Sequence, residues 1–320
     1  MAEQLSLLES ETVVTPPTRS VPRSQLSEWS YSRRSLFEQC PRRYYYNYYG
    51  SSARTACAEP LKEQLRFLKS ISNISLRAGE IMHLTIRTYL NDCRKGKIWK
   101  IDSILSWAQK NFLSDLRYSR EYKYQGQKLN EYEVLLLEFY HNQDDAEANW
   151  EKAATRLQTA LTNFFTNPEI EKFRLSALYP DALIEKRFSL KGEHFRFTGQ
   201  IDLAYREDSC IKVVDWKIGE SGGSDDSLQL LFYALVILDE FKCTSDSVEL
   251  FKVCLEDGEV LNYMVTDEET RRARMRIIQD GIRMRSLDHY GREGIVDAFT
   301  PCQQSRICRL CPFQSLCPQE

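Results

Sequence analysis

The chain has 320 residues, a length that fits one elaborated domain or a core with an insertion. Its 42% hydrophobic residues can bury a large core, and no run approaches the roughly 18 consecutive apolar residues of a membrane-spanning helix, so disordered and membrane-spanning classes are excluded. The 43 basic and 46 acidic residues give a net charge of -3, so any nucleic-acid surface must be a local patch.

Residues 1–28 are predicted to form a flexible leader, because Ser, Thr and the pair Pro16-Pro17 occur there without a sustained period. The N-terminus lacks the charged and apolar stretches of a signal peptide, which predicts a cytoplasmic protein with reduced cysteines. Residues 29–92 are predicted to be the N-terminal helical part of the functional domain. Arginines and tyrosines alternate from Tyr31 to Gly50, where a short helix containing Cys40 is expected.

Residues 93–180 are predicted to be a helical insertion. No proline occurs between Pro60 and Pro168, and apolar residues recur at helical spacing, most clearly over 104–118 and 150–165.

Residues 181–299 change to a period of two and are predicted to form the α/β core. The expected elements are strands at 182–190, 194–203 and 210–218, a helix at 226–241, a hairpin at 248–265 turning at Asp257-Gly258, and a basic helix at 268–285. Residues 300–320 form a cysteine-rich tail.

The segment Val213-Val214-Asp215-Trp216-Lys217 is the most informative one. Alternate residues of a strand share a face, so Asp215 and Lys217 are expected to point the same way, with Trp216 packing on the other side. If Asp202 ends the neighbouring strand, two carboxylates converge and could hold Mg²⁺ or Mn²⁺ near a phosphate. Lys217 could then orient or deprotonate the attacking water. A surface ion pair is the alternative interpretation, but the position between two valines and a Gly- and Ser-rich loop favours a site at a strand end.

Three more side chains are candidates for this site. His83 begins a helical segment, where a histidine is more often a satisfied core residue than a ligand. Gln229 and Tyr233 are four residues apart on the predicted helix and share a face that could contact a DNA backbone, although core packing explains Tyr233 almost as well.

The cysteines Cys308, Cys311 and Cys317 are close enough in sequence to bind one centre, and Cys40 could supply a fourth thiolate. Cys302 competes for a ligand position. Four thiolates suit either a [4Fe-4S] cluster or a structural zinc, and the spacing alone leaves both open.

These segments together resemble the PD-(D/E)XK nucleases of the RecB/AddB type that carry an iron-sulfur cluster, a group related to CRISPR-associated iron-sulfur exonucleases. The matching segments, in the order of that family, are Cys40-Pro41-Arg42-Arg43-Tyr44, Gly79 with His83, Gly199-Gln200-Ile201-Asp202, Asp215-Trp216-Lys217, Gln229 with Tyr233, and Cys308-x2-Cys311-x5-Cys317. The resemblance implies a restriction-endonuclease-like mixed sheet, with a large helical insertion and a C-terminal cysteine cluster.

The resemblance also implies roles for individual residues. His83, Asp202 and Asp215 would bind Mg²⁺ or Mn²⁺, Lys217 would be catalytic, and Glu185 matches a further acidic position. The four cysteines would hold a [4Fe-4S] cluster. The length of the helical stretch is closer to helicase-linked nuclease domains, which makes a helicase subunit an expected partner.

The basic helix carries Arg271, Arg272, Arg274, Arg276, Arg283 and Arg285, which are too many to share one face. Arg272 and Arg276 lie one turn apart and are predicted to contact DNA phosphates. Arg42 and Arg43, among tyrosines, are predicted to do the same on single-stranded DNA, although those tyrosines could equally pack around the metal centre.

The sequence therefore predicts a metal-dependent DNA nuclease, an exonuclease on single-stranded or end-containing DNA, in repair, recombination or anti-phage defence. The alternatives are a catalytically silent DNA-binding scaffold subunit of a helicase or defence complex, and a zinc-ribbon interaction protein. The retained Asp202, Asp215 and Lys217 argue against the scaffold, which would not need all three.

Overall fold

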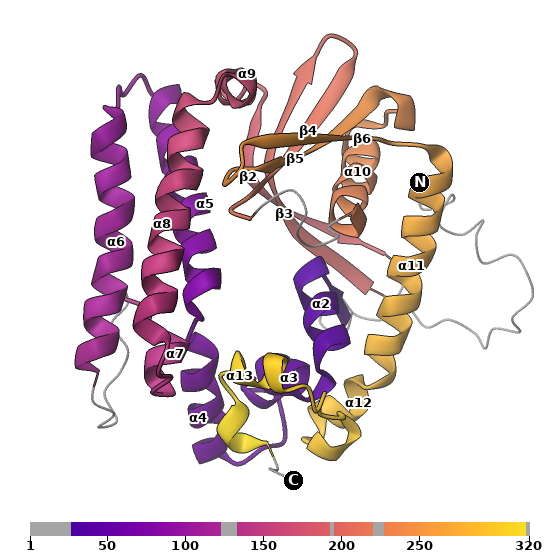
Figure 1. Cartoon of the computed structure of the whole chain (residues 1–320). Helices are drawn as coiled ribbons and strands as arrows, with labels where there is room; N and C mark the ends of the chain where they lie inside the picture. The colour runs from indigo at the N-terminus through magenta and orange to yellow at the C-terminus, as the bar shows by residue number, and fades with distance from the viewer. Residues whose placement is uncertain (1–26, 123–132, 193–194, 220–226, 318–320) are drawn as a thin grey trace, which may run out of the picture.

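The computed structural model describes residues 27–122, 133–192, 195–219 and 227–317, and within them the chain forms an α/β fold around a mixed six-stranded sheet (Figure 1). The strands are β1 (Ser27–Trp29), β2 (Leu183–Lys191), β3 (Phe195–Glu207), β4 (Cys210–Lys217), β5 (Val248–Cys254) and β6 (Glu259–Met264). The α-helices are α2 (Tyr31–Gln39), α3 (Pro41–Tyr45), α4 (Glu59–Ser70), α5 (Ile74–Arg94), α6 (Ile101–Glu121), α7 (Leu137–Tyr140), α8 (Ala146–Thr166), α9 (Pro168–Ser176), α10 (Ser227–Phe241), α11 (Asp267–Ser286), α12 (Asp288–Arg292) and α13 (Ser305–Arg309).

The order of the sheet is β1-β3-β4-β5-β6, and β2 pairs with the other edge of β3. β4 and β5 are parallel and buried on both faces, and α10 crosses between them, as a parallel pair requires. The β5–β6 hairpin turns at Gly258, whose φ of 76° confirms the predicted turn at Asp257-Gly258.

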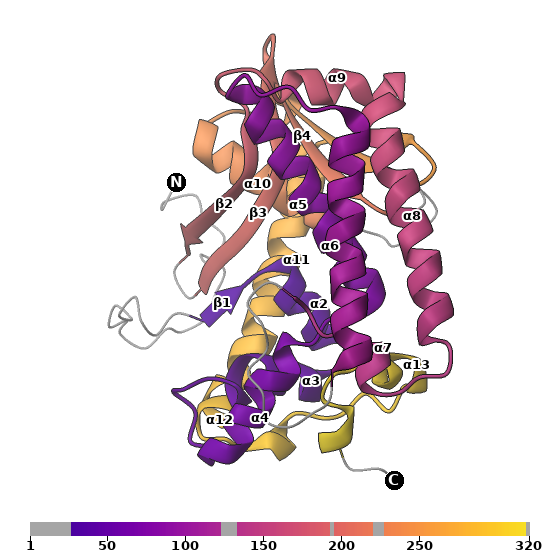
Figure 2. The ribbon, with the colours of Figure 1, turned by 90° about the vertical axis from the view of Figure 1, so that its left-hand side faces the viewer.

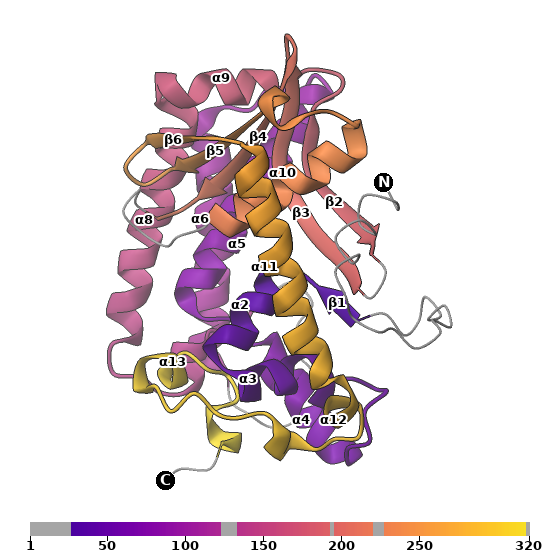
Figure 3. The same ribbon diagram turned by 90° about the vertical axis from the view of Figure 1, so that its right-hand side faces the viewer.

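Helices cover both faces of the sheet. Figure 2 shows the side with α5, α6 and α8, and Figure 3 shows the side with α10 and α11. One core packs α10 and α11 against Ile201, Val213 and Leu250. The other packs α5, α8 and α9 against Leu203, Val214 and Trp216. The segment predicted as a helical insertion is therefore one of the two layers that bury the sheet.

Two local expectations are corrected by the structure. Ser27 and Glu28, predicted to end the leader, begin β1, which pairs in parallel with the start of β3; residues 1–26 lie outside the described residues. Cys40 does not lie within a helix, because it has an extended backbone and caps the start of α3, where Pro41 follows it. Tyr46–Gly50 then continue as a turn of π-helix.

The N-terminal helices and the C-terminal tail lie together at one end of the molecule, where α13 is beside α3 (Figures 1 and 3). Tyr46 donates a hydrogen bond to the carbonyl of Leu316 at 3.1 Å, and its ring packs on Phe313. Within the described ranges, every helix is too short or too polar to cross a lipid bilayer.

Candidate active site

The pairing of β3 with β4 ends next to Asp202 and Asp215. The two strands pair from Glu207–Cys210 as far as Leu203–Val214, and beyond that point Asp202 and Asp215 no longer face each other across a ladder. Instead, Oδ2 of Asp202 accepts the backbone N–H of Trp216 at 2.9 Å. The sequence analysis placed Asp202 at the end of its strand, but the structure places it inside β3. It lies at the point where the pairing of β3 with β4 stops.

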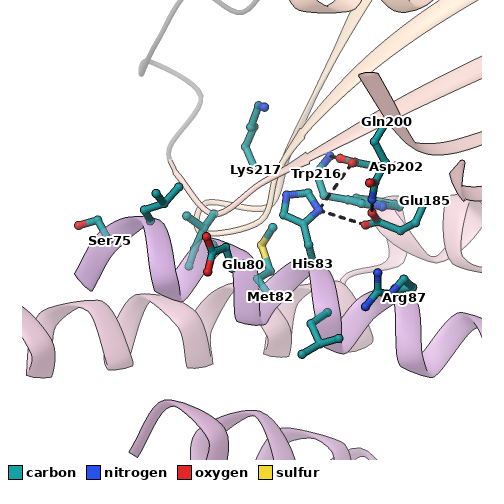
Figure 4. A pocket seen from close by; sticks show the side chains of 14 residues that line it. Ser75, Glu80, Met82, His83, Arg87, Glu185, Gln200, Asp202, Trp216 and Lys217 are labelled. Atoms are coloured by element: carbon teal, nitrogen blue, oxygen red, sulfur yellow. Dashed lines mark hydrogen bonds and ion pairs between the residues drawn. The ribbon is translucent and has the colours of Figure 1, made fainter. Parts of the chain in front are cut away.

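Three ligand atoms from three different elements meet beside this point (Figure 4). Nδ1 of His83, from α5, lies 3.4 Å from Oε1 of Glu185 and 3.7 Å from Oδ1 of Asp202. The ligand atoms of these three residues all lie within 4.8 Å of one another. Glu185 lies between Ile184 and Lys186, which pair with Leu203 and Ile201 of β3, and has a φ of 49°, a strained value for a non-glycine residue in a strand.

The electrostatics of this trio show that negative charge is concentrated there. Burial, together with the charges of Asp215 and Glu185, raises the pKa of Asp202 to about 7 even though His83 and Lys217 oppose the shift. Burial alone would lower the pKa of His83, but the carboxylates of Asp202, Glu185 and Asp215 outweigh burial and raise the pKa to about 9. The raised pKa values of Asp202 and His83 both mean that binding of a positive charge, such as a proton or a cation, is favoured at this site.

Asp215 belongs to a second group next to the trio. Its Oδ2 lies 2.9 Å from Nζ of Lys217, so the two side chains point the same way as predicted. Trp216 is buried on the opposite side against Phe164 and Phe173. Lys217, the last residue of β4, keeps 27% of its side chain exposed and lines the pocket beside the trio.

Gln229 connects the lysine and the aspartate. Its Oε1 accepts from Nζ of Lys217 at 3.1 Å, and its Nε2 donates to Oδ1 of Asp215 at 3.3 Å and to the hydroxyl of Tyr233 at 2.6 Å. Burial and the charges of Asp215 and Asp202 raise the pKa of Tyr233, which keeps the phenol neutral. Gln229 and Tyr233 thus lie beside the aspartate–lysine pair, and their contact with a DNA backbone stays a prediction.

Replacing Gln229 with Ala is expected to lower kcat about 10- to 100-fold, because the lysine and the aspartate lose their shared partner. Tyr233→Phe should cost less, since the ring still packs on Phe188 and only one hydrogen bond is lost. Single-turnover cleavage rates at saturating enzyme would check this order, and a larger loss for Tyr233→Phe than for Gln229→Ala would contradict it.

The pocket over the trio has a volume of about 500 Å³ and lies between α5 and residues of β2, β3 and β4. Besides the predicted residues, its lining includes Leu76, Gly79, Glu80 and Arg87 of α5 and Gln200 of β3. Gln200 donates a hydrogen bond to Glu185. Sequence reasoning had named no role for Glu80 or Arg87, although both fall one turn from His83 and so share its helix face.

The family follows from the sequence as a whole. A family model described as the PD-(D/E)XK nuclease superfamily matches residues 28–318. The chain belongs to the PD-(D/E)XK nuclease superfamily.

Solved structures give more distant similarities to this nuclease. A crystal structure of a "putative exonuclease" from Eubacterium rectale is 12% identical, with a TM-score of 0.43, and the match covers 92% of this chain and 93% of that one. A second structure, SSO0001, is 16% identical, with a TM-score of 0.28, and the match covers 56% and 80% of the two chains. The search of curated proteins gave no match.

Nucleases of this superfamily typically depend on a divalent metal, and the trio fits one. Two carboxylates and an imidazole are ligands suited to Mg²⁺ or Mn²⁺. Oε1 of Glu185 is buried and has no hydrogen-bond partner among the described residues, so a ligand position is free. Asp215, which the resemblance named as a ligand, lies with Lys217 next to the trio, and Glu185 takes the third position within it.

The nuclease has a second concentration of metal-binding groups at the far end of the molecule. Cys40, Cys302, Cys308, Cys311 and Cys317 line one cavity of about 540 Å³, together with Arg43. Burial and the neighbouring thiols Cys317 and Cys40 raise the pKa of Cys311 to about 12, with Arg43 opposing. None of the ten cysteines forms a disulfide. A cationic centre in this cavity would favour the thiolate form of Cys311.

The structure distinguishes among the arginines predicted to contact DNA. Arg42 is buried, donates to the carbonyl of Phe299 at 2.6 Å and pairs with Asp297, so it anchors the tail and cannot reach a phosphate. Arg43 faces the cysteine cavity. Arg272 and Arg276 lie on α11, beyond α10 from the trio, and pair with Glu268 and Asp280 within their own helix.

Proposed function

We propose that this protein is a divalent-metal-dependent deoxyribonuclease that acts as an exonuclease on single-stranded or end-containing DNA. The observation that carries the proposal is the pair of buried Asp215 and half-buried Lys217, 2.9 Å apart, beside the His83–Glu185–Asp202 trio. A charged pair that served only as a surface contact would not be bridged by Gln229 at the edge of a pocket.

The chain's own residues supply the rest of the chemistry. A bound metal ion would activate water and offset the charge on the phosphate. Nζ of Lys217, held by Asp215 and Gln229, can orient the attacking water and stabilise negative charge that develops on the phosphate oxygens. Burial of the carboxylates around Asp202 strengthens each of these interactions.

A pH-dependent response to metal tests the assignment of the trio. Because Asp202 has a pKa of about 7 in the folded state, above its ordinary value of 3.8, its contribution to stability is fully present below about pH 4 and is lost as pH rises through 7. Mn²⁺ binds the ionised carboxylates, so its thermal stabilisation should be larger at about pH 8 than at about pH 5.5.

Asp202→Asn keeps an acceptor for the Trp216 N–H and removes the charge. This variant should be more stable than wild type in EDTA at about pH 8 and should respond weakly to Mn²⁺. Equal melting shifts in the two proteins at both pH values would place the metal elsewhere.

We further propose that Cys40, Cys308, Cys311 and Cys317 hold a [4Fe-4S] cluster. The four cysteines line one cavity together with Cys302, which lies 3.9 Å from Cys308. The resemblance to nucleases that carry an iron-sulfur cluster supports a cluster there, and metal analysis distinguishes it from a single zinc ion.

The decisive experiment incubates anaerobically purified protein with end-labelled single- and double-stranded oligonucleotides and with circular single-stranded DNA, in Mg²⁺, Mn²⁺ or EDTA. The proposal requires metal-dependent release of short products from ends and survival of the circle. Cleavage of the circle would make the enzyme an endonuclease. Binding without cleavage in either metal would favour the DNA-binding scaffold.

A role in DNA repair, recombination or anti-phage defence, in the cytoplasm and alongside a helicase subunit, remains part of the proposal. Contacts of Arg272 and Arg276 with DNA stay a prediction. Arg272 pairs with exposed Glu268 and could readily exchange it for a phosphate, whereas Arg276 is exposed but pairs with buried Asp280.

A further inference from the structure

One face of α5 forms the wall of the catalytic pocket. Leu76, Glu80, His83 and Arg87 recur at intervals of three and four residues, which places them on a single stripe beside Gly79, and all five line the pocket. Figure 4 shows His83 between Glu80 and Arg87 along the helix, with its ring toward Asp202 and Glu185.

Gly79 has no structural reason to be a glycine. It lies inside a helix of 21 residues that is capped by Asn73, where glycine is unfavourable, and its φ is not positive. A Cβ built on Gly79 would meet no atom within 4 Å. The empty space lies on the pocket, and close approach of a ligand to the helix backbone is a common reason for a glycine at such a position.

Arg87 differs from the other arginines of α5. Arg77 pairs with Asp115 and Glu80, and Arg94 donates to the carbonyls of Pro180 and Ala182. Arg87 is exposed on the pocket, and no ion pair or hydrogen bond joins its side chain to the part of the chain that the structure describes. The acidic residue on the same wall, Glu80, is already neutralised by Arg77 at 3.1 Å.

The spacing of these residues suits a polyanionic strand. Arg87 lies one turn beyond His83, about 6 Å along the helix, a distance comparable to that between neighbouring phosphates of a nucleic-acid strand. On the other side of His83, Gly79 leaves open space and Leu76, 54% exposed, offers an apolar surface suited to a sugar or base.

We infer that the substrate strand lies along α5, with Arg87 binding the phosphate next to the one being hydrolysed and Gly79 admitting the sugar and base on the other side of His83. This inference rests on the proposed nuclease function and adds the path of the strand. Arg87 is a binding residue in this arrangement, because it reaches a phosphate that does not react.

Arg87→Ala should raise KM for a single-stranded oligonucleotide about tenfold or more with little change in kcat, since the lost contact is made in both ground and transition states. Arg87→Lys should recover part of the loss. The matched control is Arg117→Ala, which removes an exposed arginine from α6, away from the pocket, and should leave KM unchanged. A KM equal to wild type in Arg87→Ala would overturn the inference.

Oligonucleotides that carry one neutral methylphosphonate identify the phosphate. In wild type, neutralising the phosphate beside the scissile one should weaken binding, and in Arg87→Ala the same change should have no further effect. If the losses of binding free energy from Arg87→Ala and from the methylphosphonate add at every position of the oligonucleotide, Arg87 contacts none of these phosphates.

Gly79→Ala separates substrate contact from folding. The melting temperature should stay the same or rise, because alanine favours the helix and its Cβ meets only open space, while kcat/KM should fall. Unchanged cleavage in this variant would place the strand elsewhere.

Anisotropy of a labelled oligonucleotide in Ca²⁺ keeps this test separate from the test of the proposed function. If wild type binds DNA but never cleaves it, the nuclease proposal fails, while the comparison of Arg87→Ala with Arg117→Ala still decides the path. If wild type cleaves and the two variants bind alike, only the path is overturned.

Discussion

Replacing Lys217 with Ala is expected to reduce cleavage about 10³-fold or more, equivalent to about 4 kcal/mol of transition-state stabilisation, with the fold unchanged. Asp215 and Gln229 together hold the ammonium group of Lys217 at the edge of the pocket, whereas the buried packing of β4 depends on Val213, Val214 and Trp216. Single-turnover experiments would measure the cleavage rate, and circular dichroism would show whether the fold is unchanged.

Lys212→Ala is the matched control, because Lys212 is on the same strand and pairs with Glu207 at the other end of it. This variant should cleave at the wild-type rate. A Lys217→Ala protein that kept more than about a tenth of wild-type activity would remove Lys217 from the catalytic group.

Cys311→Ser is expected to abolish the visible chromophore and to lower the melting temperature more than any other single cysteine substitution. Cys311 is the most buried of the tail thiols that line the cavity, and a centre bound there would join α3 to the tail. Metal centres of this kind contribute many kcal/mol to folding. Absorbance near 400 nm and iron analysis would test the loss of the chromophore, and thermal unfolding would test the lower melting temperature.

Two further substitutions define the ligand set. Cys243→Ser, a half-buried thiol remote from the cavity, should keep both chromophore and stability. Cys302→Ser should keep the chromophore if Cys40 is the fourth ligand. Loss of the chromophore in this variant would make Cys302 the fourth ligand in place of Cys40. About one zinc and no iron in the wild type would replace the cluster with a zinc site.

The strands of the core were predictable from the sequence. β2, β3 and β4 alternate in hydrophobicity, and the Asp257-Gly258 turn marks the hairpin, so local rules and the fold agree. β1 was not predictable, because three residues are too few to show a period and its partner lies far along the chain. The proline after Cys40 was an available sign that the helix breaks there.

The parts of the site that depend on one strand were predictable from the sequence, and the parts that depend on packing between distant elements were not. The direction of Asp215 and Lys217 follows from strand geometry. The meeting of His83, Glu185 and Asp202 depends on the packing of α5 on the sheet, which only the family resemblance could suggest. Arg42 was assigned to the surface because a sequence does not show that a guanidinium will meet the carbonyl of Phe299 in the interior.

The shared cavity of Cys40 and the tail cysteines has a consequence for how the protein is made. Synthesis proceeds from the N-terminus, so every strand of the sheet leaves the ribosome before the last thiol does. Until then the rings of Tyr45 and Tyr46 lack Phe299 and Phe313, and their apolar surface stays open to chaperones or aggregation. A metal centre in this cavity could therefore be completed only after Cys317 has been made, and without that centre the chain would carry a finished sheet with α3 and the cysteine tail not yet joined.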